Sequence, residues 1–388
     1  MHQIQQKIAE SADFLREHAR AAEDLGRLPD EVAQRLREIG IVRMLQPTEY
    51  GGEAADPVDF FEAVMAIGAL CGASGWVSGV VGVHPWQLGQ WDERLQDELW
   101  GQDADTWIAS PYAPLGRARK VEGGYRFSGR WPFSSGTDHC DWIILGGLIV
   151  DDEGRVSEPE PYNFVLPRAD YTIHHDSWDV IGLRGSGSKD VSVDDAFIPD
   201  YRVNKPANFN DGIQAAVSGR NAPLYQVPFG TIFPGAINAA TLGLAQGALD
   251  TFVDHTRDRV SIKGGAAVGD TSQMVTLGEA AADVRASRIV FLDDWKRMYA
   301  DAVAGRPITR AQRIEMRSSS VRAVRRAVDA VDRLFMNAGG GSLQASHPLQ
   351  RFWRDMHAGM NHICSVAPPM HLAWSRDTFG LEVDPLGW

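Results

Sequence analysis

The 388-residue sequence predicts an α+β protein in which a block of strands separates two blocks of helices. Apolar residues recur every three to four positions from Ile4 to about Gly101, which is the period of a helix. Between Trp107 and about Asn204 this pattern gives way to short apolar runs separated by glycine, aspartate and proline turns. The helical period then returns. We therefore expect an N-terminal helical domain over 1–105, a middle β domain over 106–210 and a C-terminal helical bundle over 211–388.

Two helices of the first domain have clear starting signals. Asp56 precedes Pro57, and Asp92 precedes an apolar-periodic stretch that runs to Trp100. An aspartate at the N-cap accepts a hydrogen bond from a first-turn N–H. Proline is favoured at the first helical position because it lacks a backbone N–H, which would have no partner there. Both aspartates are therefore predicted to be N-caps.

The middle domain contains strand signals at 142–145, 162–166 and 190–193, with a glycine turn at 123–124. Its most informative stretch is 123–136, which predicts a hairpin that ends in two hydroxyls, Ser134 and Ser135. The edge of a flavin would fit beside them. The alternative is that these serines only cap a β-turn, as serine before glycine often does.

The last third of the chain predicts long helices after a loop from about Lys205 to Ala222. Valines and one phenylalanine between Val321 and Phe335 alternate at three and four residues, which places them on one face of a helix. This face indicates a helical bundle.

Charge and cysteine content exclude several classes of function. The formal net charge of −13 argues against a nucleic-acid or anionic-membrane partner, because a polyanion requires a basic face. The three cysteines are far apart and form no CxxC pair, so we expect a reducing, cytoplasmic location. No apolar run approaches the roughly 18 residues of a membrane helix. His139 has no second histidine within metal-ligand spacing, so we expect no metal site.

Four motifs in a fixed order carry a resemblance to a known family. They are 110–116, 123–139, 178–188 and 350–359. Together they resemble the oxygenase components of two-component flavin-dependent aromatic monooxygenases, the group that hydroxylates hydroxyphenylacetate and phenolic secosteroids. The resemblance covers essentially the whole chain. It implies the acyl-CoA dehydrogenase fold, in which a middle β domain and a C-terminal four-helix bundle hold a flavin between them.

The resemblance also implies the reaction and its participants. Reduced FMN or FAD reacts with O2 to form a C4a-hydroperoxide, which hydroxylates a phenolic or other small aromatic substrate, commonly ortho to a hydroxyl. No GxGxxG follows a predicted strand, so the chain is not expected to reduce its own flavin. A separate NAD(P)H:flavin reductase is the expected partner, and the fold implies a homotetramer.

One position separates a monooxygenase from a dehydrogenase. Acyl-CoA dehydrogenases remove a proton with a glutamate about eight residues after the Arg-Asp of the last motif, and Ile363 occupies that position here. Its neighbour His362 matches a histidine of the monooxygenases. Because imidazole titrates near neutrality, His362 is predicted to be a base or a group that positions the hydroperoxide. The alternative is a buried histidine bonded to backbone.

The remaining site residues are implied by the resemblance alone. The catalytic set is His362, Ser134, His84 and Ser135, with the serines at the flavin N5 edge and His84 on the substrate side; a solvent-facing helix-end histidine is the alternative for His84. The predicted flavin-binding residues are Trp107, Ser110, Phe133, Ser134, Ser188, Arg259 and Gly340. Arg259 and Gly340 are expected to reach the flavin phosphate of a neighbouring subunit, and a solvated charge at a helix end is the alternative for Arg259.

Three other functions remain open from the sequence. The first is an acyl-CoA dehydrogenase-like flavin oxidoreductase that uses a different base. The second is a sulfur or nitrogen monooxygenase of the same fold, and the third is a flavin carrier without catalysis. The substrate itself cannot be read from the motifs, because the segment after His362 departs from the relatives.

Overall fold

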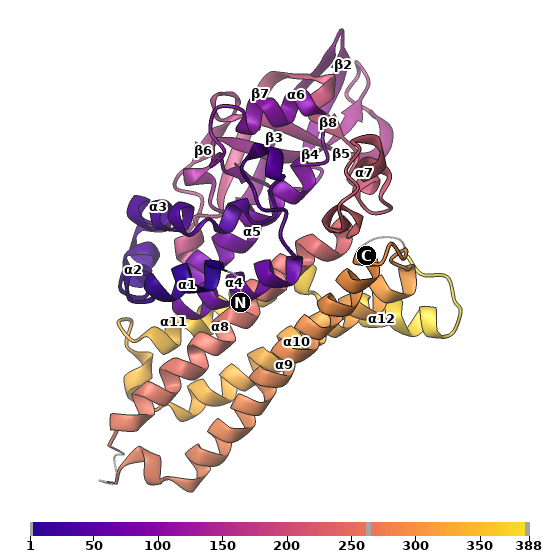
Figure 1. Cartoon of the computed structure of the whole chain (residues 1–388). Helices are drawn as coiled ribbons and strands as arrows, with labels where there is room; N and C mark the ends of the chain where they lie inside the picture. Colours follow the sequence, from indigo (N-terminus) through magenta and orange to yellow (C-terminus); the bar gives the residue numbers. More distant parts are fainter. Residues whose placement is uncertain (1–2, 261–264, 385–388) are drawn as a thin grey trace.

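The computed structural model describes residues 3–260 and 265–384. Figure 1 shows a sheet-containing upper part, a set of N-terminal helices against it, and long helices that extend away below. Within these described ranges, strands occur only between Ile108 and Asn204, and helices lie on both sides of this block in the sequence. The predicted α+β order of helices, strands and helices is confirmed.

Six helices fill the first part of the chain: α1 (Gln3–Glu10), α2 (Ala12–Leu25), α3 (Asp30–Ile39), α4 (Pro57–Leu70), α5 (Gly72–Leu88) and α6 (Glu93–Trp100). Both predicted N-caps are confirmed, since Asp56 accepts from the N–H of Val58 and Asp92 accepts from the N–H of Arg94. Every residue of α5 is buried, because this helix lies between the sheet and the bundle. It is therefore placed to contribute side chains to a site between them.

The middle part is one sheet with the strand order β6-β7-β3-β2-β4-β5-β8, and β1 pairs with β4. Its strands are β1 (Ile108–Ala109), β2 (Gly116–Val121), β3 (Gly124–Ser134), β4 (Trp142–Val150), β5 (Val156–Pro167), β6 (Thr172–His174), β7 (Lys189–Pro199) and β8 (Val203–Asn204). The predicted hairpin is β2–β3, joined by a turn in which Gly123 has a φ of 74°. Such a turn favours glycine because it has no Cβ.

The last part is a bundle of α8 (Phe229–Asp258), α9 (Thr271–Val303), α10 (Arg310–Asn337) and α11 (Pro348–Met360), with α12 (Ala367–Thr378) against α10. The predicted valine face lies on α10, where Val321, Val324, Val328 and Val331 are buried. The segment expected to be a loop from Lys205 to Ala222 is more ordered than predicted, since it contains α7 (Ile213–Val217).

Helix α8 is long and apolar enough to cross a membrane by composition alone. In the structure 83% of its most apolar window is buried in the bundle. A helix that is apolar on all sides is expected at the centre of a large core. We therefore interpret α8 as the central core helix of the bundle.

Candidate active site

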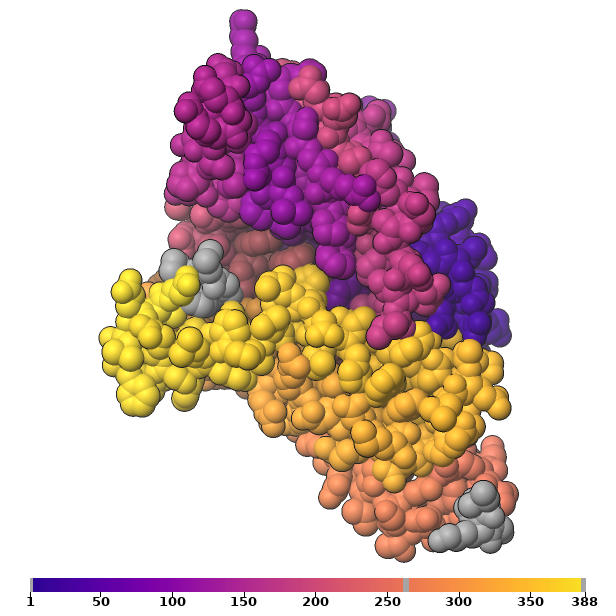
Figure 2. Space-filling view, turned by 180° about the vertical axis from the view of Figure 1, so that it is seen from behind, coloured from indigo at the N-terminus to yellow at the C-terminus, as the bar shows by residue number. Residues whose placement is uncertain are grey.

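A cavity of about 730 Å³ lies where the sheet meets the bundle. Figure 2 shows a recess between the magenta sheet region and the yellow C-terminal segment. The cavity is lined from α5 by Trp76 and Val80; from the sheet and its loops by Ser110, Phe133, Ser135, Trp178, Val180, Ile181, Gly182, Leu183, Ser186 and Ser188; and from the bundle by Phe233, Ala358, Asn361, His362, Ile363 and Val366. Five of the predicted site residues therefore line one space: Ser110, Phe133, Ser135, Ser188 and His362.

Three serine hydroxyls form a bonded cluster on one wall. The Oγ atoms of Ser135 and Ser188 are 2.8 Å apart, and those of Ser188 and Ser186 are 2.7 Å apart. The indole N–H of Trp76 donates to Ser135 Oγ at 3.1 Å. The cluster joins the end of the β3 hairpin to the start of β7, so Ser135 does more than cap a turn.

Two non-glycine residues with left-handed backbone line the same cavity. Phe133 has a φ of 67° and Leu183 a φ of 53°. This region is unfavourable for bulky side chains, and residues held there cluster at ligand sites. Both residues bring main chain up to the cavity wall, where it can contact a ligand.

Ser110 is hydrogen-bonded to a buried histidine on α5. His84 Nδ1 lies 2.6 Å from the carbonyl oxygen of Ile108, and His84 Nε2 lies 2.8 Å from Ser110 Oγ. A carbonyl only accepts, so Nδ1 of the neutral ring carries the proton and Nε2 accepts from the Ser110 hydroxyl. Ser110 itself lines the cavity, and its Oγ can accept a further hydrogen bond from a ligand there.

The surroundings of His84 keep it neutral. It is fully buried, and its ring stacks on Phe233 with centroids 6.4 Å apart and meets Tyr112 edge-on at 5.9 Å. Burial lowers the pKa of His84 to about 4, against a smaller opposing effect of the hydrogen bond to Ile108. The solvent-facing alternative for this histidine is wrong. His84 does not itself line the cavity, but it is hydrogen-bonded to Ser110, which does.

His362 lies on the bundle side, between α11 and the short helical turn Ile363–Ser365. Its Nδ1 accepts a hydrogen bond of 3.2 Å from the N–H of Cys364. Burial, helped by the charge of Arg317, lowers the pKa of His362 to about 4. The ring is therefore neutral with its proton on Nε2, and it presents a donor rather than a basic nitrogen at that atom.

Other predicted residues lie behind the cavity wall. Ser134 is fully buried with an Oγ that has no hydrogen-bond partner among the described residues, and it does not line the cavity. Trp107 is also fully buried, with the guanidinium of Arg37 4.4 Å from its ring. Both were placed at the flavin by the family resemblance. Their predicted contacts with a flavin stay predictions.

Arg259 and Gly340 lie at the far end of the bundle, where α8 ends. The guanidinium of Arg259 donates to the carbonyl oxygen of Ala338 at 2.6 Å, which ties it to the glycine segment that contains Gly340. It is thus not a solvated helix-end charge. The structure does not bring these two residues to the cavity of their own chain, and their predicted contact with a neighbouring subunit stays a prediction.

Several lining residues were missed from the sequence. Trp76 and Val80 precede His84 by eight and four residues, so all three share one face of α5, and this spacing was a usable signal. Phe233, on α8, and Asn361, directly after α11, gave no comparable signal, because the rotation of the bundle helices depends on packing. Asp355 was also missed as a functional candidate, and it contacts the loop that forms one side of the cavity.

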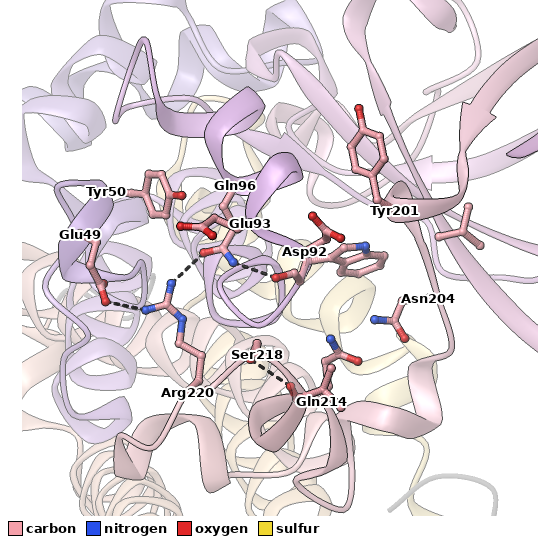
Figure 3. Close-up of a pocket in the computed structure, with 14 residues that line it drawn as sticks. Glu49, Tyr50, Asp92, Glu93, Gln96, Tyr201, Asn204, Gln214, Ser218 and Arg220 are labelled. Atoms are coloured by element: carbon pink, nitrogen blue, oxygen red, sulfur yellow. Dashed lines mark hydrogen bonds and ion pairs between the residues drawn. The ribbon is translucent and has the colours of Figure 1, made fainter. Parts of the chain in front are cut away.

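A second cavity of about 730 Å³ lies between α6, α7 and the end of the sheet. Figure 3 shows Arg220 pointing between Glu49 and Gln96, and it donates to their side-chain oxygens at 2.7 and 2.8 Å. Gln96 in turn donates to the carbonyl oxygen of Trp91. These polar groups are satisfied by one another, so we interpret them as a network that ties the N-terminal helices to the segment before the bundle. Among the described residues, no group of three or more His, Cys, Asp or Glu could hold a metal ion.

Comparison with known proteins agrees with this geometry. The family models for the acyl-CoA dehydrogenase N-terminal and C-terminal domains match residues 2–91 and 236–366. A pigment production hydroxylase of Rhodococcus erythropolis is 43% identical, over 100% of this chain and 98% of that protein. The flavin-dependent monooxygenase oxygenase subunit HsaA of Rhodococcus jostii is 40% identical, over 95% of this chain and 96% of the relative.

A solved structure gives the same result. The crystal structure of 3-HSA hydroxylase from Rhodococcus sp. RHA1 superposes with a TM-score of 0.94 at 38% identity, covering 99% of this chain and 98% of that one. The sequence motifs, the cavity between sheet and bundle, and these full-length matches agree. The chain therefore belongs to the oxygenase components of flavin-dependent monooxygenases that have the acyl-CoA dehydrogenase fold.

Proposed function

We propose that this chain uses reduced FMN or FAD and O2 to hydroxylate a phenolic ring, ortho to its hydroxyl. The observation that carries the proposal is the Ser110–His84 pair, in which the hydroxyl of a cavity-lining serine donates a hydrogen bond to a buried neutral imidazole. Such a pair can receive the proton of a phenol. No carboxylate is among the described lining residues, so the cavity lacks the carboxylate base with which an acyl-CoA dehydrogenase removes a proton.

The wall of the cavity fits a flavin ring. Its volume lies within the range of cofactor pockets, and it is mostly apolar with a few hydroxyls on one side. The unpaired Oγ of Ser134 lies behind this wall, beside the strained backbone of Phe133. Phe133, Ser135 and Ser188, which line the cavity, would hold the polar edge of the ring, and Ser134 lies directly behind them. Bound reduced flavin supplies the activation of O2 that no side chain provides.

Ser110 and His84 are the proposed proton path from the substrate. The phenol O–H donates to Ser110 Oγ, whose own proton already points at His84 Nε2. A phenol titrates near 10, and the pKa of His84 is about 4, so full transfer in the resting complex is unfavourable. We infer that the pair polarises the phenol and takes its proton only as the ring loses electrons to the incoming oxygen.

His362 is proposed as a hydrogen-bond donor rather than a base. Its Nδ1 is occupied by the N–H of Cys364, so its Nε2–H is the atom that can hold a ligand oxygen in the cavity. The edge-on ring of Trp76, 5.7 Å away, and Phe233 at 6.2 Å fix the orientation of the imidazole. These aromatic rings, with Trp178, also exclude water, which would otherwise release the activated oxygen as hydrogen peroxide.

We further propose that the chain acts as a homotetramer and receives reduced flavin from a separate reductase. Large apolar side chains are exposed on the outer faces of α9, at Val275 and Ile289, and at Met336 near the end of α10. Burial of these residues against further copies would remove apolar surface from water. Sedimentation of the purified chain tests this, and a monomer at micromolar concentration would contradict it.

Product analysis with labelled oxygen tests the proposed function. The chain is supplied with reduced flavin by a generic reductase, a panel of phenols and isotopically heavy O2. We expect a catechol-type product that carries the label in its new hydroxyl, and less product with more peroxide in Ser110→Ala. Ser78→Ala is the matched control, because Ser78 is a buried serine of α5 that does not line the cavity. A product without label, or no hydroxylated product from any phenol, would overturn the proposal.

A further inference from the structure

The cavity between the sheet and the bundle has an uncharged lining throughout its described residues. Aromatic and aliphatic side chains form most of the wall, and its polar members are four serines, Asn361 and His362. The ring of His362 is neutral for the reasons given above. A ligand inside therefore meets apolar surface and neutral dipoles.

Most of the polar atoms on this wall are already bonded. The hydroxyls of Ser135, Ser186 and Ser188 bond to one another, and the amide nitrogen of Asn361 donates to the carbonyl oxygen of His357. Ser110 Oγ remains as an acceptor and His362 Nε2–H as a donor. This acceptor and this donor match the hydrogen-bonding needs of a hydroxyl and of an oxygen atom held beside it. They do not match the four lone-pair sites of a carboxylate.

Phe233 separates the two polar groups. Its ring stacks on His84, which holds Ser110, with centroids 6.4 Å apart, and lies 6.2 Å from the ring of His362. Trp178, Val180 and Ile181 add further apolar surface to the lining. The space between is suited to the flat apolar body of an aromatic compound rather than to a second polar group.

Two cations that contact lining segments are turned away from the cavity. Arg317 lies behind His362 and donates to the carbonyl oxygen of Cys364 at 2.8 Å. Arg354 donates to the carbonyl oxygen of Ile181 and to Glu23. Both guanidinium groups face protein acceptors, and neither lines the cavity.

We propose that the substrate is an uncharged phenol with an apolar body, and that the cavity discriminates against phenols that carry a carboxylate. The inference deepens the proposed function and rests on it. Transfer of a carboxylate from water into an apolar space without a cation costs several kcal/mol, and each tenfold in affinity corresponds to about 1.4 kcal/mol. We expect the neutral member of an isosteric pair to bind more than about tenfold tighter.

Paired probes test this directly. The pairs are 4-hydroxyphenylacetamide with 4-hydroxyphenylacetate, and 6-hydroxy-2-naphthamide with 6-hydroxy-2-naphthoate. Binding to the flavin-loaded protein is measured by quenching of tryptophan fluorescence, since Trp76 and Trp178 line the cavity, and oxygenation is measured separately by product analysis. Equal or tighter binding of a carboxylate, or no binding of either amide, would overturn the inference. If the amides bind preferentially but no pair member is oxygenated, the proposed function fails while the selectivity stands.

A designed cation provides the second test. Ile363 lies at the cavity with 78% of its surface exposed, so a longer polar side chain can be placed there without disturbing the core. Ile363→Arg should tighten carboxylate binding by about tenfold or more relative to Ile363→Gln, which adds polarity without charge. Equal carboxylate affinity in the two variants would show that charge in the cavity does not control selection.

Discussion

The carboxylate of Asp355, on α11, accepts a hydrogen bond of 2.6 Å from the backbone N–H of Leu183, on the loop that precedes β7. Leu183 lines the cavity with a left-handed backbone, and Asp355 is buried, with 4% of its surface exposed. Seven lining residues come from the segment 178–188. Because α11 also leads into His362, this contact links the cavity segment 178–188 to the helix that precedes His362.

Replacing Asp355 by alanine is expected to loosen this segment. The change leaves the N–H of Leu183 without an acceptor in a buried place, which costs about 1–3 kcal/mol. We expect lower stability, weaker flavin binding and more peroxide per turnover. Asp355→Asn keeps an acceptor oxygen and serves as the control. The free energy of unfolding in urea and the flavin dissociation constant check the prediction, and equal losses in both variants would contradict it.

The same carboxylate predicts a pH dependence of stability. Burial raises the pKa of Asp355 from its ordinary 3.8 to about 6, against the opposing hydrogen bond from Leu183 and the charges of Arg351 and Arg354. Because the pKa of Asp355 is higher in the native state than in the unfolded chain, its protonation stabilises the native state at low pH. This stabilisation is lost as pH rises from about 4 to 6. Over this window we expect wild type to lose up to about 3 kcal/mol relative to Asp355→Asn. Urea unfolding at several pH values checks this, and a constant difference would contradict it.

The sequence predicted the fold well because its signals are local. Three kinds of signal depend only on neighbours along the chain: the three-to-four spacing of apolar residues, the N-caps Asp56 and Asp92, and the turn at Gly123. The structure has all of them. The helical segment within 205–222 was missed. Its α7 has only five residues, too few to produce a periodic pattern.

The candidate site was predictable only in part, because it is assembled from distant elements. Ser135, Ser188 and His362 were predicted from motifs, and the structure places all three on one cavity. Phe233 and the contact between Asp355 and Leu183 depend on how α8 and α11 pack on the sheet, which no local pattern specifies. The protonation pattern of His84 also required the structure, since burial and a carbonyl partner determine it.

Both site histidines are expected to stay neutral throughout the working pH range. Their pKa values of about 4 lie below the ordinary 6.5 because of burial. Because the unfolded chain takes up these protons at higher pH than the native state does, the contribution of the two histidines to the free energy of unfolding is fully present above pH 6.5. It is lost as pH falls towards 4. We therefore expect their ring signals to stay constant from pH 8 to 5 in NMR of histidine-labelled protein. His84→Gln and His362→Asn assign the signals, and a midpoint near 6.5 for either would contradict the prediction.

Ser110 and His84 are expected to act as one unit. Ser110→Ala removes the hydroxyl that faces the cavity, and His84→Gln keeps hydrogen-bonding atoms but cannot take up a proton. Each change should lower kcat/KM for a phenol by roughly 100-fold, the scale of general base catalysis. The double variant should lose about the same factor rather than the product of the two, because each single change already breaks the path. Multiplicative losses in steady-state kinetics would show that the residues act separately.

Gly182 is expected to tolerate no side chain. A Cβ at this position would lie 2.2 Å from the carbonyl oxygen of Arg354 and 3.1 Å from the Cβ of Ala358, so Gly182→Ala must push the cavity loop away from α11. Overpacking of this kind costs about 1–3 kcal/mol. Gly278→Ala on α9 is the matched control, since its Cβ would have no neighbour within 4 Å. We expect only Gly182→Ala to weaken flavin binding and raise peroxide release. If both variants bind flavin like wild type, close contact between the loop and α11 is not what shapes the site.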